Sequence, residues 1–319
     1  MRRKEKILKK KGPVSSKPSK KKKSSYKALN FYDQYYKQLL LIPVLLLLIS
    51  IISIGVLYAN TGDFFHKGIS LSGGVTITLV EEDVDYSDLE NNLRSEFSQY
   101  EVNVRSLTDA GSQVGVIVES NILPEDELSD DFIDRVKELT GVSEDNMSVE
   151  SIGASLGDAF FRQTAVALLF AFLFMGIVVF AYFRSFIPSA AVILAAASNI
   201  IVTVAILNLI NFRLGTAGIA ALLMLIGYSV DTDILLTTRL LKEKEGTLFE
   251  RLLGAMRTGV TMTGTTLVAV TVAFIVAESQ VLREIILVVM IGLVIDLINT
   301  WLQNASILRW YVERNVEYD

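Results

Sequence analysis

Three aspartates lie inside apolar stretches of the sequence, where charged side chains are unexpected. Asp231 and Asp233 fall within residues 226–236, and Asp296 falls within residues 291–298. A charge inside a membrane is costly unless it faces a bundle interior or water, so such acids are by default candidates for function. Burial favours the protonated carboxyl group and a nearby arginine favours the ionised one, so a carboxyl group between these influences can bind and release a proton. The chemistry predicted is a proton relay.

Arg257 stands at the start of the next apolar stretch, at a depth that could meet Asp231. Asp231 and Asp233 are two residues apart, about 200° around a helix, and cannot face the same partner. We expect one of them to point toward a centre formed by Arg257 and Asp296. The other would face a neighbouring helix, a water-filled vestibule or a second subunit. The alternative is structural, with Asp231 and Arg257 joined in a static salt bridge that locks helix packing.

Paired intramembrane carboxylates also raise the possibility of an intramembrane aspartyl protease. Asp231 and Asp296 could supply its two catalytic groups, but the Tyr-Asp and Gly-x-Gly-Asp pairing of such enzymes is absent from the sequence. We therefore expect no enzymatic activity and no catalytic residues. The chain has no cysteine and a single histidine, His66, which excludes thiolate and multi-histidine metal sites. We expect neither a metal nor a cofactor.

The elements that must position these residues are membrane-spanning helices. The mean hydropathy of the chain is +0.44, because apolar residues are concentrated in long runs. Six stretches are each apolar over about 20 residues, the length that crosses a bilayer. They are residues 39–58, 164–183, 188–210, 216–236, 260–277 and 285–308. The sequence therefore predicts an α-helical polytopic membrane protein with six transmembrane helices.

Charge is segregated along the chain. Residues 1–38 hold fourteen Lys or Arg and two acids, whereas residues 59–162 hold six Lys or Arg and twenty-two acids. Further basic residues fall in the loops after the second and fourth stretches: Arg184, Arg239, Lys242, Lys244, Arg251 and Arg257. Because Lys and Arg stay on the cytoplasmic side, we expect both termini inside and residues 59–162 outside. The predicted location is the cytoplasmic (cell) membrane.

The cytoplasmic segments are predicted to be simple. Residues 1–38 are too charged to bury a core and are expected to form a basic disordered tail. Its simplest role is a topology signal; attraction to the lipid bilayer or to RNA is the alternative, and without aromatic residues among the lysines we expect no specific nucleic acid. Residues 242–256 are expected to form an amphipathic segment on the membrane surface, and residues 309–319 a second cytoplasmic tail.

Residues 59–162 are predicted to form one extracytoplasmic α+β domain between transmembrane helices 1 and 2. Alternating or continuous apolar residues indicate strands, and a spacing of three to four indicates helices. The strands are expected at residues 75–80, 101–107, 114–118 and 147–152, and the helices at residues 85–100 and 125–139. This βαββαβ order is the signature of a ferredoxin-like split βαβ sandwich. Its acids are scattered over predicted solvent faces.

Three motifs punctuate this architecture. Directly after the first span, residues 67–74 read KGISLSGG; within the fourth span, residues 227–239 read GYSVDTDILLTTR; and Arg257 precedes a threonine-rich fifth span. With these motifs the chain resembles the SecD/SecF branch of the resistance–nodulation–division (RND) superfamily, and within it the archaeal-type SecF proteins. The resemblance covers residues 39–310.

The resemblance assigns roles residue by residue. Residues 67–74 are similar to the Asp-Leu/Phe-x-Gly-Gly element of the family, with Ser70 where many relatives have Asp and with three motif glycines, Gly68, Gly73 and Gly74. Residues 227–239 are similar to the fourth-span motif Gly-Tyr-Ser-Val-Asn-Asp-Thr followed by Arg. Aligned without gaps, Thr232 stands at the position of the bacterial SecF acid and Asp231 at that of the SecD acid. We therefore favour Asp231 over Asp233 as the relay acid, with Arg257 similar to the family's functional arginine.

The resemblance implies an accessory subunit of the Sec protein-export machinery, paired with a SecD-type subunit beside the Sec translocation channel. The pair would form a twelve-span bundle that couples proton re-entry to movement of the external domains, which hold secreted precursor polypeptides. The coupling ion, proton or sodium, stays open. The alternatives are half of a small-molecule or lipid exporter of the same superfamily, against which the short external domain argues, or a non-conducting scaffold subunit.

Overall fold

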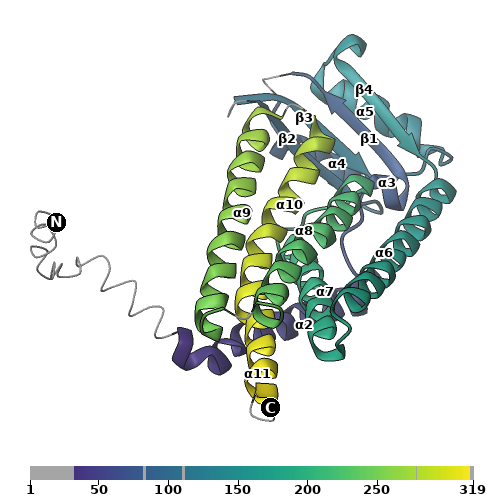
Figure 1. Cartoon of the computed structure of the whole chain (residues 1–319). Helices are drawn as coiled ribbons and strands as arrows, with labels where there is room; N and C mark the ends of the chain where they lie inside the picture. The colour runs from purple at the N-terminus through teal and green to yellow at the C-terminus, as the bar shows by residue number, and fades with distance from the viewer. Residues whose placement is uncertain (1–31, 82–83, 110–111, 244, 278, 317–319) are drawn as a thin grey trace, which may run out of the picture.

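The computed structural model describes residues 32–81, 84–109, 112–243, 245–277 and 279–316. A bundle of long helices carries a small β-sheet at one end, which we call the sheet end; α11 (Ala305–Val316) lies at the other, far end (Figure 1). Residues 1–31 of the predicted tail lie outside the described residues. Residues 32–38 are helical, contrary to the prediction of disorder, because the Tyr32 hydroxyl donates to the carbonyl oxygen of Trp301 (2.5 Å) and anchors this stretch to the bundle.

Long apolar helices form the bundle, as the sequence predicts. Among the described residues, five helices are long and apolar enough to cross a membrane, and they coincide with the first five predicted spans. They are the helix Tyr32–Thr61, whose main part is α2 (Leu41–Thr61), α6 (Ala154–Phe183), α7 (Phe186–Leu209), α8 (Thr216–Leu241) and α9 (Leu248–Val276). The chain is therefore a helical, multi-pass membrane protein.

The predicted sixth span, residues 285–308, is not one uninterrupted α-helix. α10 (Gln280–Ile298) continues through a π-helical turn, η2 (Asn299–Asn304), into α11. α10 carries three charged residues, Arg283, Glu284 and Asp296, and η2 is polar. The continuous helical segment of α10, η2 and α11 is therefore not one of the five apolar helices. The sixth transmembrane helix stays a prediction.

The segment expected to lie on the membrane surface is largely the beginning of α9. Thr247 accepts a hydrogen bond from the backbone N–H of Glu250, and the Glu250 carboxylate accepts one from the backbone N–H of Thr247. Such a capping box starts a helix. Because no proline follows, the helix continues without interruption into the predicted fifth span, and residues 248–256 are not a separate element.

The sheet domain has the predicted order of elements. Its strands are β1 (Gly74–Leu79), β2 (Val102–Asp109), β3 (Ser112–Ser120) and β4 (Met147–Ile152), and its helices are α4 (Tyr86–Glu96) and α5 (Leu128–Thr140). The four strands form an antiparallel sheet in the order β2-β3-β1-β4. Val75, Ile77 and Leu79 are fully buried under α4 and α5, while Thr76 and Thr78 face a cleft toward the helix ends. The alternation read from the sequence is therefore correct.

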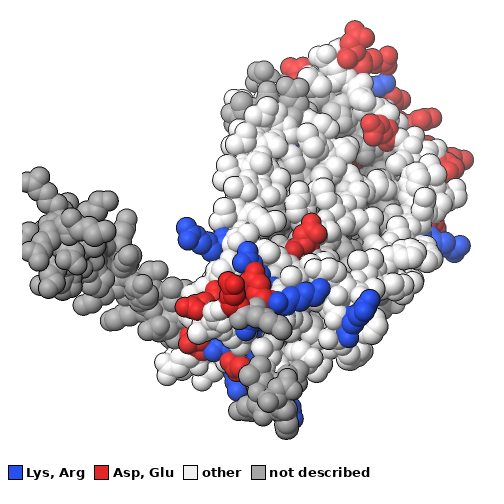
Figure 2. Space-filling view, viewed as in Figure 1, with Lys and Arg blue, Asp and Glu red and all other residues white. Residues whose placement is uncertain are grey.

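The helices of the bundle differ in how much they are enclosed. α7 and α8 are central, with 67% and 56% of their apolar windows buried, whereas the helix that contains α2, α6 and α9 are each 11% buried. α10 packs against α7, α8 and α9. Figure 2 shows a broad belt with few charged groups between the charged surfaces of the two ends. The outer faces of α2, α6 and α9 thus offer an apolar surface to lipid or to a partner.

Candidate functional site

α8 and α10 bring two of the three predicted aspartates together inside the bundle. Asp233 and Asp296 lie about 24–26 Å from the first residues of their helices, at a rise of 1.5 Å per residue. Their side chains are 0% and 2% exposed, and the two carboxylates interact with each other. The pair therefore lies at one depth, nearer the far end of the bundle than the sheet end.

The partners of these carboxylates come from α7 and η2. The Asn304 amide nitrogen donates to Asp233 Oδ1 (2.7 Å), and the Asn199 amide nitrogen lies 3.4 Å from Asp296 Oδ1. Thr300, at 0% exposure, lies close to both carboxylates without making a hydrogen bond of normal geometry to either. We call these five residues the carboxylate cluster. None of the ion pairs between described side chains includes Asp233 or Asp296, so both groups are buried without a basic partner.

Several oxygens of the cluster have no hydrogen-bond donor. Asp233 Oδ2 and the amide oxygens of Asn199 and Asn304 are buried and unpaired. The Thr300 hydroxyl makes no hydrogen bond of normal geometry. Buried polar groups are nearly always paired, so a group of unpaired acceptors is unusual.

The structure does not bring Asp231 and Arg257 together. Both side chains are exposed, Asp231 on α8 and Arg257 on α9, and none of the ion pairs between described side chains joins them. The expectation that only one of Asp231 and Asp233 faces the interior is correct, and the inward one is Asp233. The centre it faces contains Asp296 but not Arg257. Asp231 and Arg257 instead lie on surfaces that lipid or a partner would cover.

The motif glycines form a joint between the sheet and the helices. The Gly68 N–H donates to the carbonyl oxygen of Leu214 (2.9 Å), which holds the chain before the short helix α3 (Ile69–Ser72) against the start of α8. Gly73 has φ +80°, and Gly74 has φ +134°, where an added Cβ would lie 2.2 Å from the carbonyl oxygen of Ser120. At Gly74 only glycine fits, which gives this part of the motif a structural reason.

The same joint contains an acid that the sequence analysis missed. Glu284, at the sheet end of α10, accepts hydrogen bonds from the backbone N–H groups of Gly215 (2.7 Å) and Gly218 (2.9 Å) at the start of α8. Burial raises the pKa of this carboxyl group, and the two backbone donors oppose the rise. Ser70 accepts from the N–H of Thr216 (2.9 Å), so a serine side chain from α3 satisfies a backbone donor at the start of α8.

The polar residues of η2 were also missed. Thr300 and Asn304 lie inside the stretch predicted as the sixth span, and four polar side chains within six residues, NTWLQN, are the signal that could have found them. Glu284 precedes that stretch, and its partners lie 66 and 69 residues away in the sequence. No local pattern reveals that pairing.

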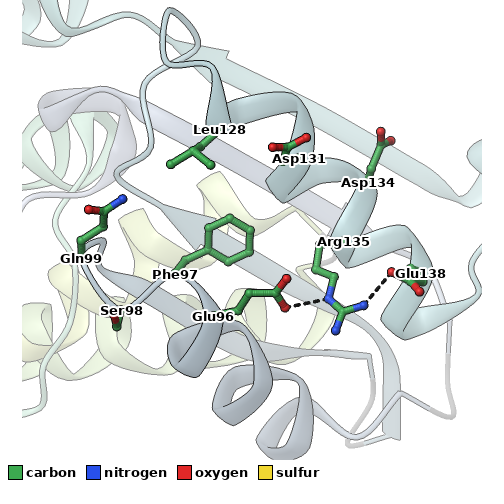
Figure 3. A pocket seen from close by; sticks show the side chains of 9 residues that line it. All are labelled: Glu96, Phe97, Ser98, Gln99, Leu128, Asp131, Asp134, Arg135 and Glu138. Atoms are coloured by element: carbon green, nitrogen blue, oxygen red, sulfur yellow. Dashed lines mark hydrogen bonds and ion pairs between the residues drawn. The ribbon is translucent and has the colours of Figure 1, made fainter.

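A groove on the sheet domain gathers acids in a different way. It lies between α4 and α5, and it is lined by Glu96, Phe97, Ser98, Gln99, Leu128, Asp131, Asp134, Arg135 and Glu138 (Figure 3). Arg135 donates to Glu96 (2.7 Å) and to Glu138 (2.6 Å), and all three side chains are in contact with water. Among the described residues, no three His, Cys, Asp or Glu side chains are arranged to hold a metal ion. The groove is a solvated, paired surface.

The fold and the carboxylate cluster define a class: a multi-pass helical membrane protein with an α+β domain at one end and buried acids in its bundle. Residues 132–314 match the family described as Protein export membrane protein SecD/SecF, C-terminal. The chain belongs to this family.

Proteins named Protein-export membrane protein SecF are similar over most of the chain. The one from Methanolacinia petrolearia is 41% identical over 90% of this chain and 96% of its own length. The one from Methanocaldococcus jannaschii is 39% identical over 87% of this chain and 96% of its own length. The recognition of an archaeal-type SecF from its motifs is confirmed.

A solved structure shares the fold. The crystal structure of SecDF, a translocon-associated membrane protein from Thermus thermophilus, superposes with a TM-score of 0.67 at 19% identity, over 87% of this chain and 38% of that chain. A second form of SecDF, called super-membrane-facing, gives a TM-score of 0.53 at 21% identity. The present chain spans little more than a third of the SecDF chain, and the likeness is one of fold.

Proposed function

We propose that this protein is a non-catalytic accessory subunit of the Sec protein-export machinery that works with a SecD-type partner. Together they would couple proton movement through the membrane bundle to translocation of secreted precursor polypeptides through the Sec translocation channel. The observation that carries the proposal is the carboxylate pair Asp233–Asp296, buried without a basic partner in a member of the SecD/SecF family. A buried pair of acids without a basic partner destabilises the fold, and acids inside a membrane are by default candidates for function.

The proposal includes an orientation. The helical path through α10 and η2 would complete six transmembrane helices, both termini would be cytoplasmic, and the sheet domain, ferredoxin-like in its strand order, would lie outside the cytoplasmic membrane. Lys and Arg near the far end favour this orientation. The carboxylate cluster would then lie in the cytoplasmic half of the bundle.

The chain's own residues suggest how the two ends communicate. Asp233 and Asp296 would hold the proton, and Asn304 and Thr300 would move with η2 when the charge of the pair changes, because π-helical turns are frequent at functional sites. η2 is continuous with α10, whose other end carries Glu284 at the joint with α8 and the sheet domain. A shift of α10 along its axis would therefore reach the external domain.

Asp231 and Arg257 have a separate place in this proposal. Their exposed side chains on α8 and α9 would be covered by the SecD-type partner, since a charge facing lipid is unfavourable. Asp231 would then complete the relay at the contact between the two subunits, while Asp233 works inside this one.

The test measures export of a secreted precursor into inverted membrane vesicles that contain this chain with its partner subunit, with and without an imposed proton gradient. Asp233→Asn and Asp296→Asn should each abolish the stimulation by the gradient. The control Asp130→Asn changes an exposed acid of the sheet domain and should retain it. Full gradient-dependent stimulation in both bundle variants would contradict the proposal.

One observation favours the scaffold alternative. The hydrogen bond from Asn304 to Asp233 is short, 2.7 Å, and would also suit a fixed packing contact. In that case Asp233→Asn would lower the amount of partner that co-purifies with this chain and leave the gradient dependence of the remaining complexes unchanged. Quantifying both in the same membranes separates the two functions.

A further inference from the structure

A cleft of about 370 Å³ lies at the joint, where the sheet sits over the ends of the helices (Figure 1). One wall is the face of the sheet that points away from α4 and α5, and the other is formed by α3, the start of α8 and the start of α10. Three acids line the cleft: Glu119 of β3, Glu150 of β4 and Glu284 of α10. The cleft is separate from the carboxylate cluster, which lies nearer the far end of the bundle.

The register of the sheet aligns two of these acids. Glu119 and Glu150 are both paired with Thr76, from the strands on either side of β1. Because paired residues point to the same face and neighbouring strands lie about 4.8 Å apart, the two acids flank Thr76 with their backbones about 10 Å apart. Glu284 belongs to the opposite wall, and Glu119 and Arg105 both act electrostatically on its carboxyl group. The three acids therefore line one space from two sides.

The lining of the cleft carries more acids than bases. Two arginines contribute to it, and each already has an acidic partner. Arg105 pairs with Glu119 (2.5 Å), and Arg213 pairs with a glutamate outside the lining (3.1 Å). None of the ion pairs between described side chains includes Glu150 or Glu284. Two carboxylates of the cleft are thus left for a cation from elsewhere.

Glu119 gives an independent indication of a ligand. Its side chain is only 8% exposed. Its Oε1 accepts a hydrogen bond from Arg105, but its Oε2 is buried and has no donor. Buried polar atoms are nearly always paired, and a buried carboxylate is stable only when its oxygens are satisfied. A donor bound in the cleft would satisfy this oxygen.

The remaining lining suits an aliphatic stem. It is largely apolar and includes Ile69, Leu107, Ile117, Ile152 and Val281. A lysine side chain buries its methylene groups along such a surface, while its ammonium group offers three hydrogen-bond donors. No three His, Cys, Asp or Glu side chains in the described part of the chain are arranged to hold a metal ion. The cleft therefore fits an organic cation better than a metal.

We propose that this cleft binds an alkylammonium group, supplied by a lysine side chain of a polypeptide or by a free amine. The ammonium group lies among the carboxylates of Glu119, Glu150 and Glu284, and the stem lies along the apolar wall. The inference goes beyond the proposed function, since it concerns a different site and requires no proton movement through the bundle.

The experiment uses the absence of cysteine from the chain. Thr78→Cys places a single thiol at a half-buried position of the lining. The rate of its modification by neutral methyl methanethiosulfonate is measured on the full chain in detergent, at fixed pH and ionic strength. The probes are a short alanine peptide with a central lysine, the same peptide with a central glutamine, and n-butylamine.

We expect saturable protection of the thiol by the lysine peptide, by butylamine or by both, and none by the glutamine peptide. Protection by the lysine peptide alone identifies a polypeptide as the source of the ammonium group, and protection by butylamine shows that a free amine suffices. Equal protection by the two peptides, or no protection by either the lysine peptide or butylamine, would overturn the proposal.

Acid substitutions in the Thr78→Cys chain locate the effect. Glu119→Gln should raise the probe concentration for half-maximal protection about tenfold and the exposed Glu150→Gln about threefold, because a buried charge is screened less than an exposed one. Asp130→Asn, which changes an exposed acid outside the cleft, should leave this concentration unchanged. If Glu119→Gln fails to fold, Glu150→Gln decides, since its side chain is exposed. Unchanged protection in Glu150→Gln would overturn the proposal.

The two proposals can fail separately. Absence of protection in the Thr78→Cys chain, together with loss of gradient-stimulated export in Asp233→Asn, would overturn the cleft site and leave the proposed function standing. Protection that Glu150→Gln weakens, together with normal stimulation in Asp233→Asn and Asp296→Asn, would leave the site and overturn the function.

Discussion

Acidic side chains are used in opposite ways in two regions of this molecule. In the α4–α5 groove, Glu96 and Glu138 pair with Arg135 in contact with water. In the carboxylate cluster, Asp233 and Asp296 are buried without any basic partner among the described ion pairs. Water screens exposed pairs, so they contribute little to stability, while a buried unpaired charge is expensive. The acids that cost the most to keep are therefore those to which we assign the function.

The difference implies that the sheet domain is stabilised by its apolar core and not by its charges. Phe132 of α5 is fully buried and meets Phe97, which lines the groove, edge to face at 5.1 Å between ring centroids. Phe132→Ala should cost about 3–5 kcal/mol, the usual cost of removing a buried aromatic ring. This is the largest effect we expect.

The two tryptophans make the regional effect measurable. Trp301 lies in η2 and Trp310 in α11, so tryptophan fluorescence reports on the bundle. Limited proteolysis between residues 59 and 162 reports on the sheet domain. Phe132→Ala should expose the sheet domain to protease and leave the fluorescence transition in place, while Phe132→Leu should do much less. A parallel loss of both signals would mean that the two regions unfold as one unit.

Asn304→Leu tests the other region. It removes the donor to Asp233 and leaves a buried carboxylate without that partner, which should cost about 1–3 kcal/mol. Replacing both partners by apolar groups of similar shape can be nearly neutral, so the double variant Asp233→Leu/Asn304→Leu should regain most of the loss. The measurement is the midpoint of the tryptophan fluorescence transition in detergent. A double variant less stable than either single one would show that the cluster is a stabilising network.

These two predictions differ in how far the sequence foretold them. The alternation of Val75, Ile77 and Leu79 with Thr76 and Thr78 revealed the sheet core, because one face of that strand meets water. In α8 the outer face meets lipid or a partner, so outer residues such as Met224 are apolar as well, although Asp231 also lies there. The buried stripe of Leu222, Ile226, Ser229, Asp233, Leu236 and Leu240 therefore did not stand out, and motif alignment favoured Asp231 instead.

The rest of the site depends on contacts between distant segments. The six-residue turn η2 forms within a stretch that reads as one apolar span, and the partners of Glu284 are backbone groups of another helix. Spacing along one segment carries no information about the partners of Glu284, and the four polar residues of η2 mark the turn without showing what they contact. The sequence thus supplied the helices and the acids, whereas their pairing required the packed bundle.

Glu284 is intermediate between the acids of the two regions, because it is only partly buried and accepts hydrogen bonds from two backbone N–H groups. Burial raises its pKa above the ordinary value of 4.5, so the folded protein binds this proton more tightly than the unfolded chain does. Its ionised form therefore lowers stability above the raised pKa, and this penalty disappears as the pH falls toward 4.5. The unfolding temperature of the wild type should rise relative to that of Glu284→Gln as the pH is lowered through this window. Parallel pH profiles of the two proteins would contradict the assignment.

The smallest effect is expected at the groove. Arg135→Ala removes both ion pairs with Glu96 and Glu138, but water solvates the freed carboxylates, so the unfolding midpoint should not move beyond the error of the measurement. Any residual effect should shrink as salt is raised, because salt weakens ion pairs that are exposed to solvent. The proteolysis assay used for Phe132→Ala provides the readout. A loss of stability that persists at high salt would contradict this prediction, because it would show that the ion pairs of Arg135 stabilise the sheet domain.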